Sequence, residues 1–180
     1  MFKDFNIDKF KKIKPSSNNS FDTAQEVKAI KKIPLNKNFV KKHDDISKTF
    51  KQAADKNGIK DYDNKLVNKL IESSAPVIKK LKNYFNRPRP KVIAKKMNIK
   101  IEDYEMESMK TPSYPSGHST QGVLIGLVLS SMYPKGSADF KKAARDISYS
   151  RNVAKAHYKS DSKMGEKLGK EMYNHIKNKI

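Results

Sequence analysis

The chain has 180 residues, enough for one domain with its own hydrophobic core. It carries 39 Lys and Arg against 19 Asp and Glu, and its net charge of +20 favours anionic partners: nucleic acid, phosphorylated small molecules or lipid headgroups. Charge does not choose among them, and a genome biased toward Lys and Asn explains it equally well. Because the chain has no cysteine, disulfides, thiol chemistry and a Cys-based zinc site are excluded.

The N-terminal segment predicts an irregular arm over residues 1–21, with Pro15 and the polar run SSNNS. It has no apolar run like the core of a signal peptide. We therefore expect a cytoplasmic protein, or a periplasmic or secreted one if a leader has been removed. The most apolar stretch, Gly122 to Tyr133, is too short to span a bilayer and is typical of a buried core helix, so no transmembrane segment is expected.

The next segments carry helix signals. Thr23 and Glu26 have the spacing of a capping box, which predicts a short helix to about Lys32. Apolar residues then recur with helical spacing over 36–57, and Gly58 suits the position just after a helix. We expect two helices in this part of the chain.

The remainder is also predicted to be helical. Asp63 can cap a long helix, which Pro76 should kink or divide, and the string NRPRP should be extended or turning. Residues 91–114 are expected to form a long loop with a short helix inside it. Further helical patterns cover 117–132, 137–157 and 160–178, and no alternating stretch predicts a strand. The fold class is therefore all-α: a compact single-domain helical bundle over residues 22–180.

The first cluster of residues that could bind a ligand is KNYFNRPRP, Lys82 to Pro90. An arginine fork can grip two phosphate oxygens, while a lysine acts as a point charge. Taken alone, the segment is better explained as a basic surface loop. The spacing from Lys80 to Arg87 is the same as the spacing from Lys82 to Arg89. The spacing alone therefore does not decide which Lys–Arg pair would bind phosphate.

The second cluster is PSGHS, which directly precedes the apolar helical stretch. A helix start offers free backbone N–H groups and the positive end of the helix dipole to an anion. Ser116 adds a hydroxyl, Gly117 allows close approach of the backbone, and His118 could donate a proton. A common turn with an incidental histidine is the alternative.

The third cluster is SRNVAKAHYKSD, which ends at Asp161. If this segment is helical, His157 and Asp161 lie one turn apart on the same face. An aspartate that binds one imidazole nitrogen leaves the other free to attack, and Arg151 could aim at the same anion. A surface His–Asp pair explains the cluster equally well. Together, however, the three clusters favour a phosphate pocket that uses histidine chemistry, without the ligands of a metal site or a phosphate-binding glycine loop.

These residues resemble the three-part signature of the type 2 phosphatidic acid phosphatase and vanadium haloperoxidase superfamily. The matching positions are Lys82-x6-Arg89-Pro90, Pro115-Ser116-Gly117-His118 and Ser150-Arg151-x5-His157-x3-Asp161. Their order is kept, and Tyr158, Ser160 and Gly165 also look familial. The resemblance spans about Lys82 to Gly165, selects Arg89 over Arg87, and is to the soluble, acid-phosphatase-like branch.

The resemblance implies a metal-independent phosphatase that hydrolyses phosphomonoesters through a phosphohistidine. His157 would be the nucleophile, Asp161 would orient it, and His118 would protonate the leaving oxygen. The groups that hold the phosphate would be Lys82, Arg89, Ser116, Gly117 and Arg151. No cofactor or metal is implied; vanadate or phosphate would occupy the site as inhibitor or product. Two histidines in different protonation states predict a bell-shaped pH profile.

Other functions stay open. A protein of charge +20 would adhere to anionic lipid, so a lipid phosphate phosphatase at a membrane surface is one alternative. A basic nucleic-acid-binding protein is a second, and a vanadium-dependent haloperoxidase with His157 as the vanadate ligand is a third. The expected partner is a phosphorylated small molecule whose leaving group contacts 91–114 or 36–50, and a homodimer is left open. His43 and His175 are expected to have local structural roles.

Overall fold

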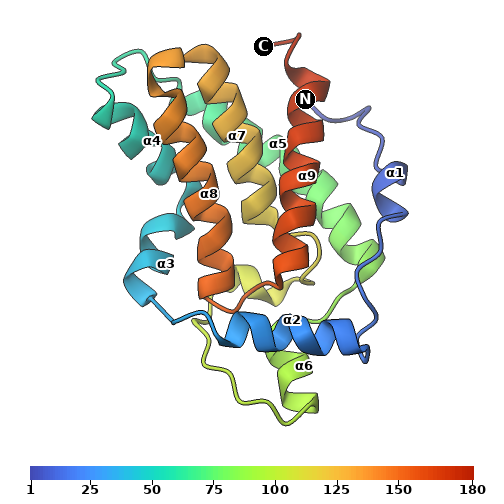
Figure 1. The fold of residues 1–180 in the computed structure, drawn as a ribbon. Helices are drawn as coiled ribbons and strands as arrows, with labels where there is room; N and C mark the ends of the chain where they lie inside the picture. The colour runs from blue at the N-terminus through green and yellow to red at the C-terminus, as the bar shows by residue number, and fades with distance from the viewer.

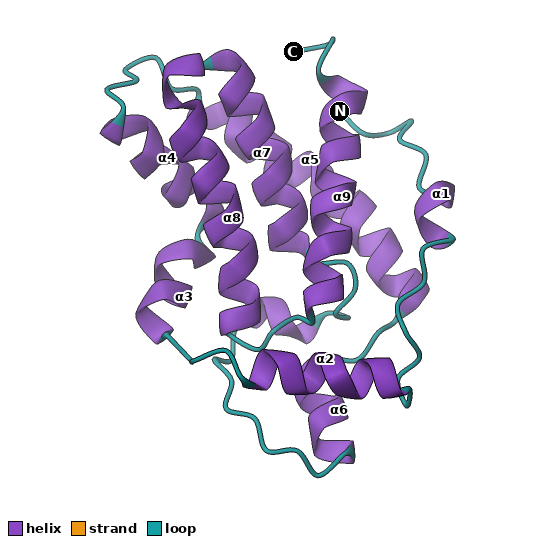
Figure 2. Cartoon of the chain, viewed as in Figure 1, coloured by secondary structure: helices purple, strands orange, loops and turns teal.

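A computed structural model describes residues 1–180 and contains helices joined by loops (Figure 1). No strand is present, which confirms the all-α prediction (Figure 2). The α-helices are α1 (Asp8–Lys11), α2 (Phe21–Lys31), α3 (Lys37–Asp44), α4 (Ile46–Lys56), α5 (Asn64–Phe85), α6 (Pro90–Lys96), α7 (Gly117–Met132), α8 (Ser137–Val153) and α9 (Lys159–Ile176). Two short 3₁₀ helices, η1 (Glu107–Lys110) and η2 (Pro134–Gly136), complete the set.

Helix α7 forms the centre of the bundle. It packs most extensively against α8 and α9, which lie in front of it in Figure 1, and it also contacts α4 and α5. Its side chains Leu124, Ile125, Val128 and Leu129 are fully buried. A helix that is apolar nearly all round must be covered on all sides, which confirms the predicted core helix. None of the helices has the length and apolarity needed to cross a membrane.

Helices α7 and α9 approach each other through glycine. A Cβ on Gly165 would lie 2.5 Å from the carbonyl oxygen of Ser116, and one on Gly169 would meet the carbonyl oxygen of Thr120. Only a residue without a side chain fits at such a distance. At the same crossing, the backbone N–H of Ser116 donates to the carbonyl of Asp161 at 3.0 Å, so the first turns of α7 and α9 are joined directly.

Two helix starts differ from the sequence-based expectation. Helix α2 begins at Phe21, because Ser20 is its N-cap and accepts from the backbone N–H of Thr23 at 3.1 Å. The predicted capping box of Thr23 and Glu26 is therefore wrong, and the Glu26 carboxylate makes other contacts. The helix expected over 36–57 is two helices, because Asp45 ends α3 and caps α4.

Other boundaries follow the expectation more closely. Gly58 has the left-handed φ of +63° expected just after a helix, and Asp63 caps α5 by accepting from the N–H of Leu66 at 2.9 Å. Helix α5 runs continuously through Pro76, so of the two predicted effects, a kink or a division, the division is wrong. Segment 91–114 contains most of α6 and all of η1, joined by loop.

The N-terminal segment packs along the bundle beside α5 and α9 (Figure 1). Its one helix, α1, has four residues. Phe2 and Phe10 are buried in the main core, and the carbonyl of Ile13 accepts from the hydroxyl of Tyr114 at 2.8 Å. The division between an arm over 1–21 and a domain over 22–180 stays a prediction.

Candidate active site

His157 lies in the loop between α8 and α9, because α8 ends at Val153. The helix expected over 137–157 is therefore too long, and the premise that His157 and Asp161 share a helix is wrong. The contact itself exists: Nδ1 of His157 lies 3.1 Å from Oδ2 of Asp161. A left-handed residue, Lys155 with φ of 61°, turns the chain so that His157 faces the first turn of α9.

The tautomer of His157 follows from its two partners. Nη1 of Arg89 lies 2.9 Å from Nε2, and because arginine only donates, Nε2 must carry a lone pair. Nδ1 then carries the proton and donates it to Asp161. Burial, together with the charges of Arg89 and Lys82, lowers the pKa of His157 to about 3 despite the hydrogen bond with Asp161. The imidazole is therefore neutral at pH 7, with Nε2 as its basic atom.

Asp161 is fully buried at the start of α9 and accepts from several donors. Besides His157, these are the Ser113 hydroxyl, the Tyr158 N–H at 3.1 Å and Nη1 of Arg87 at 2.7 Å. Burial alone would raise the pKa of Asp161, but the His157 hydrogen bond and the nearby positive charges hold it below its usual value. The carboxylate is thus kept ionised and fixed in place.

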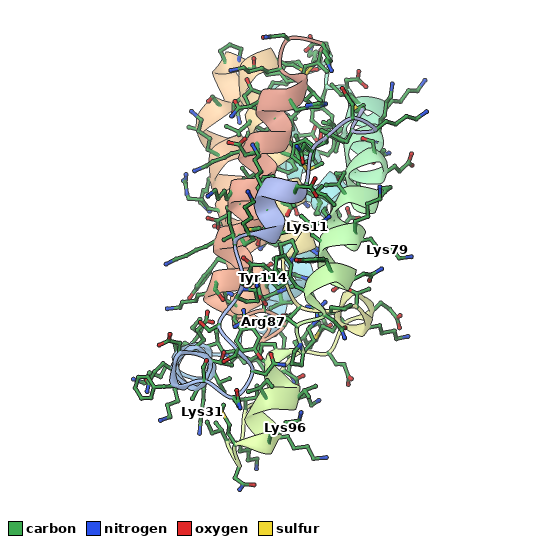
Figure 3. All side chains as sticks on the ribbon, turned by 90° about the vertical axis from the view of Figure 1, so that its right-hand side faces the viewer. Lys11, Lys31, Lys79, Arg87, Lys96 and Tyr114 are labelled. Carbon is green, nitrogen blue, oxygen red and sulfur yellow. The ribbon has the colours of Figure 1, made fainter.

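Arg87 is a partner of Asp161 that the motif resemblance does not include, because the resemblance selects Arg89. Its side chain is 1% exposed, and its guanidinium lies over the Tyr158 ring, 3.8 Å from the centroid. Figure 3 shows Arg87 close to Tyr114 in the interior, whereas Lys79 and Lys96 project outward. Nη2 of Arg87 donates to Glu26 at 2.8 Å, so α2 is tied to the site through a partly buried ion pair. The repeated Arg-Pro of NRPRP was the available signal.

Glu26 also binds the start of α9. Its Oε1 accepts from the backbone N–H of Ser160 at 2.9 Å, and its Oε2 accepts from the Ser160 hydroxyl at 2.9 Å. A carboxylate at a helix N-terminus satisfies N–H groups that have no partner within the helix. The residue expected to cap its own helix therefore caps α9.

Lys82 and Arg89 are both buried beside His157. Nζ of Lys82 donates to the carbonyl of Pro112 at 2.6 Å, and burial with the Arg89 charge lowers the pKa of Lys82 to about 7. Arg89 donates to the carbonyls of Ser108, Thr111 and Ala156 at 2.7 to 2.9 Å. Its pKa falls to about 10, chiefly because of burial. Both cations hold backbone carbonyls that an anion can replace as hydrogen-bond partners.

The PSGHS segment starts α7 as expected. Ser116 is the N-cap and accepts from the N–H of Ser119 at 3.2 Å, and Gly117 is the first helical residue. Ser116 is fully buried, and its N–H is bonded to the carbonyl of Asp161. These contacts bring Ser116 to the start of α9, while Gly117 has no hydrogen bond to another site residue.

His118 and Arg151 meet at Asp44, the last residue of α3. Nε2 of His118 lies 3.0 Å from the Asp44 carbonyl oxygen and 3.4 Å from its carboxylate, and Nη1 of Arg151 donates to the same carboxylate at 2.8 Å. The hydrogen bond with His118 and the Arg151 charge lower the pKa of Asp44 to about 2. Sequence reasoning missed Asp44, which no motif marks.

Arg151 has donor capacity to spare. Its side chain is 1% exposed, yet Nη2 is buried without a hydrogen-bond partner. A buried guanidinium N–H that lacks a partner is costly, so this atom is suited to an anionic ligand. The Arg151 charge also lowers the pKa of Arg89, which indicates that both cations act on one region.

The two other histidines have local contacts, as expected. Nδ1 of His43 is bonded to the carbonyl of Phe39 at 2.8 Å, and Nε2 of His175 lies 3.1 Å from Asp4. No group of three or more His, Asp or Glu side chains is placed to hold a metal ion.

Comparison with known proteins identifies the family. The sequence model of the PAP2 superfamily matches residues 68–169 of the chain, which include every site residue named from the motifs. The chain belongs to the PAP2 superfamily, and the motif resemblance is confirmed.

Similar curated proteins are acid phosphatases. The chain is 35% identical over 88 residues to a non-specific acid phosphatase of Salmonella typhimurium, covering 49% of this chain and 35% of that protein. It is 32% identical over 100 residues to an acid phosphatase of Zymomonas mobilis, covering 56% of this chain and 38% of that protein. The matched part thus spans little more than a third of these relatives.

Proposed function

We propose that the protein is a phosphatase that hydrolyses phosphomonoesters through a phosphohistidine on His157, without a metal ion. The proposal rests chiefly on the protonation state and tautomer of His157. Its ring is neutral and has its lone pair on Nε2, next to the buried cations Arg89 and Lys82. A lone pair directed into a cationic pocket is the arrangement that an attack on a phosphoryl group requires.

Two displacement steps follow from this geometry. In the first, Nη1 of Arg89 moves from Nε2 of His157 to a phosphoryl oxygen, which frees the Nε2 lone pair. Nε2 then forms a bond to phosphorus as the bond to the leaving oxygen breaks, and His118 gives that oxygen a proton. In the second, His118 takes a proton from water, the water oxygen attacks phosphorus, and the P–N bond breaks. Asp161 holds Nδ1–H throughout and stabilises the positive ring of the intermediate.

The buried cations supply the electrostatic part of the mechanism. Lys82 and Arg89 exchange backbone carbonyls for phosphoryl oxygens, and Nη2 of Arg151 gains the partner it lacks. Preorganised donors at the oxygens where charge accumulates are the largest contribution to such catalysis. The Ser116 hydroxyl and the Gly117 N–H complete the proposed phosphate contacts.

The leaving group of the substrate faces two segments. Asp44 contacts His118, the proposed proton donor, from the junction of α3 and α4. Sδ of Met106, in the loop before η1, lies 3.2 Å from Nη1 of Arg151. Segments 36–50 and 91–114 are therefore proposed to select the leaving group.

The test is hydrolysis of p-nitrophenyl phosphate in EDTA, with and without orthovanadate. We expect EDTA-resistant, vanadate-sensitive turnover that falls about 10³-fold or more in His157→Ala, and an acid-labile phosphoprotein after rapid quenching. His175→Ala is the matched control, because His175 lies far from the site at the end of α9. Full turnover in His157→Ala would overturn the proposal. Halide oxidation with vanadate and salt-dependent DNA binding test the alternatives.

A further inference from the structure

A row of buried hydroxyls leads from Ser116 to the other side of α7. The Ser116 oxygen lies 2.8 Å from that of Ser119, which lies 2.9 Å from that of Ser148 on α8. Ser148 in turn lies 2.7 Å from Oε1 of Glu166 on α9. All three serines are at most 3% exposed, so no solvent interrupts the row.

Counting protons gives the row a direction. Each serine hydroxyl has one proton, and an ionised carboxylate only accepts. With Glu166 ionised, Ser148 must donate to Glu166, so Ser119 must donate to Ser148 and Ser116 to Ser119. The N–H of Ser119 already donates to the Ser116 oxygen. The Ser116 proton then points along the row, away from a bound anion.

A neutral group at position 166 reverses the row. A protonated Glu166 donates to Ser148, Ser148 donates to Ser119, and Ser119 donates to Ser116. The Ser116 oxygen is then satisfied as an acceptor, and its proton is free for a phosphoryl oxygen. The two directions use the same oxygen positions, so the reversal needs only rotation of hydroxyl groups.

The Glu166 side chain faces solvent at the end of the row. It lies in the wall of an open pocket of about 270 Å³, whose floor on α7 is formed by Val123, Gly126 and Leu127. The charged groups that line this pocket with it are Lys141 and Arg145 from α8 and Lys170 from α9. With the carboxylate ionised, the row of hydroxyls points away from the proposed phosphate site.

We propose that Glu166 is a positioning residue for Ser116: through Ser148 and Ser119, its charge decides whether the Ser116 hydroxyl donates to a bound phosphoryl oxygen. This inference rests on the proposed function, because it takes Ser116 to be a phosphate ligand.

The experiment is calorimetric titration of inorganic phosphate into wild type, Glu166→Gln and Glu171→Gln between pH 4.5 and 8. A glutamine amide can donate to Ser148 as well as accept from it, so it permits the reversed direction, which an ionised Glu166 forbids. One added hydrogen bond to an anion is worth about a tenfold gain in affinity. We expect Glu166→Gln to bind phosphate about tenfold more tightly than wild type at pH 7.5.

The ratio of the two dissociation constants cancels the titration of phosphate itself. Glu171→Gln removes the same charge from α9 at a residue paired with Lys9, and it should follow wild type. In a Ser148→Ala background the row is cut, so Glu166→Gln should add nothing. Thermal denaturation shows which variants are folded.

The outcomes separate the two proposals. If wild type and Glu166→Gln bind phosphate equally at every pH, or if Ser148→Ala leaves the difference intact, the relay is wrong while the phosphatase proposal stands. If no folded variant binds phosphate, the proposed function fails, and the relay fails with it.

Discussion

Asp44 and Arg151 form an ion pair between a carboxylate that is 48% exposed and a guanidinium that is 1% exposed, with Nη1 and Oδ1 at 2.8 Å. The same residue receives Nε2 of His118 on its carbonyl oxygen. Asp44 therefore orients both the proposed proton donor and one proposed phosphate ligand from the solvent side. Since the carboxylate is itself an anion beside Arg151, it also competes with a phosphoryl group.

Asp44→Asn tests this relationship. The amide is similar in size but loses the charge that holds His118 and Arg151. We expect the ratio of kcat for p-nitrophenyl phosphate to kcat for phenyl phosphate to rise about tenfold, because only the poorer leaving group needs the donated proton. Asp45→Asn is the control, since the neighbouring Asp45 caps α4 and has no contact with His118. An unchanged ratio would contradict a role for Asp44 in proton donation.

His118→Asn should separate leaving groups more strongly. Loss of a general acid costs about 10²- to 10⁴-fold when the leaving oxygen must be protonated. We therefore expect kcat to fall in that range for phenyl phosphate and to change little for 2,4-dinitrophenyl phosphate. Equal losses for the two substrates would show that His118 acts in another way.

Lys82 predicts an alkaline limit on substrate binding. Its pKa in the fold is lowered to about 7, so the cation is present below that pH and is lost above it. KM for p-nitrophenyl phosphate should rise between pH 7 and 9 in the wild type. In Lys82→Arg the side chain stays protonated, so KM should stay level over that range. Because the pKa of a lysine in the unfolded chain is about 10.4, burial of Lys82 costs stability progressively as the pH falls from about 10 to about 7, and the cost is constant below that.

Arg87→Met should destabilise the fold. It leaves the buried Asp161 carboxylate without its ion-pair partner, and removing one member of a buried pair costs about 3–5 kcal/mol. Urea unfolding at pH 7 measures this. The matched control is Lys51→Met, because Lys51 and its partner Asp55 are 48% and 59% exposed; loss of this surface pair should cost about 0–1 kcal/mol. Similar losses in both variants would contradict a structural role for Arg87.

The motif positions could be read from the sequence because their chemistry is local. Ser116 and Gly117 start an apolar helix, and the short spacing of His157 and Asp161 allows them to meet. The reason for that meeting could not be read, since a left-handed residue at Lys155 replaces the expected helix. Apolar periodicity continues across such a turn and does not show it.

The missed residues are those that act over long distances in the chain. Asp44 meets Arg151 across 107 positions, and Glu26 meets Ser160 across 134. Such contacts depend on how helices pack, and the spacing of a motif contains no information about them. Glu26 was assigned to the wrong helix start because its spacing from Thr23 fitted a local rule that Ser20 satisfies instead.

The glycine crossing of α7 and α9 has a consequence for how this protein can change in evolution. A side chain at Gly165 would push Ser116 away from α9. It would thereby also disturb the hydrogen bond between the Ser116 N–H and the Asp161 carbonyl. Even alanine is too large at position 165, so this residue must remain glycine if the contact between Ser116 and Asp161 is to be kept. The junction of α3 and α4 and the loop around Met106 carry no such constraint from a helix crossing. If the proposed function holds, new leaving groups can be accommodated by changing these two segments while the proposed phosphate-binding residues stay as they are.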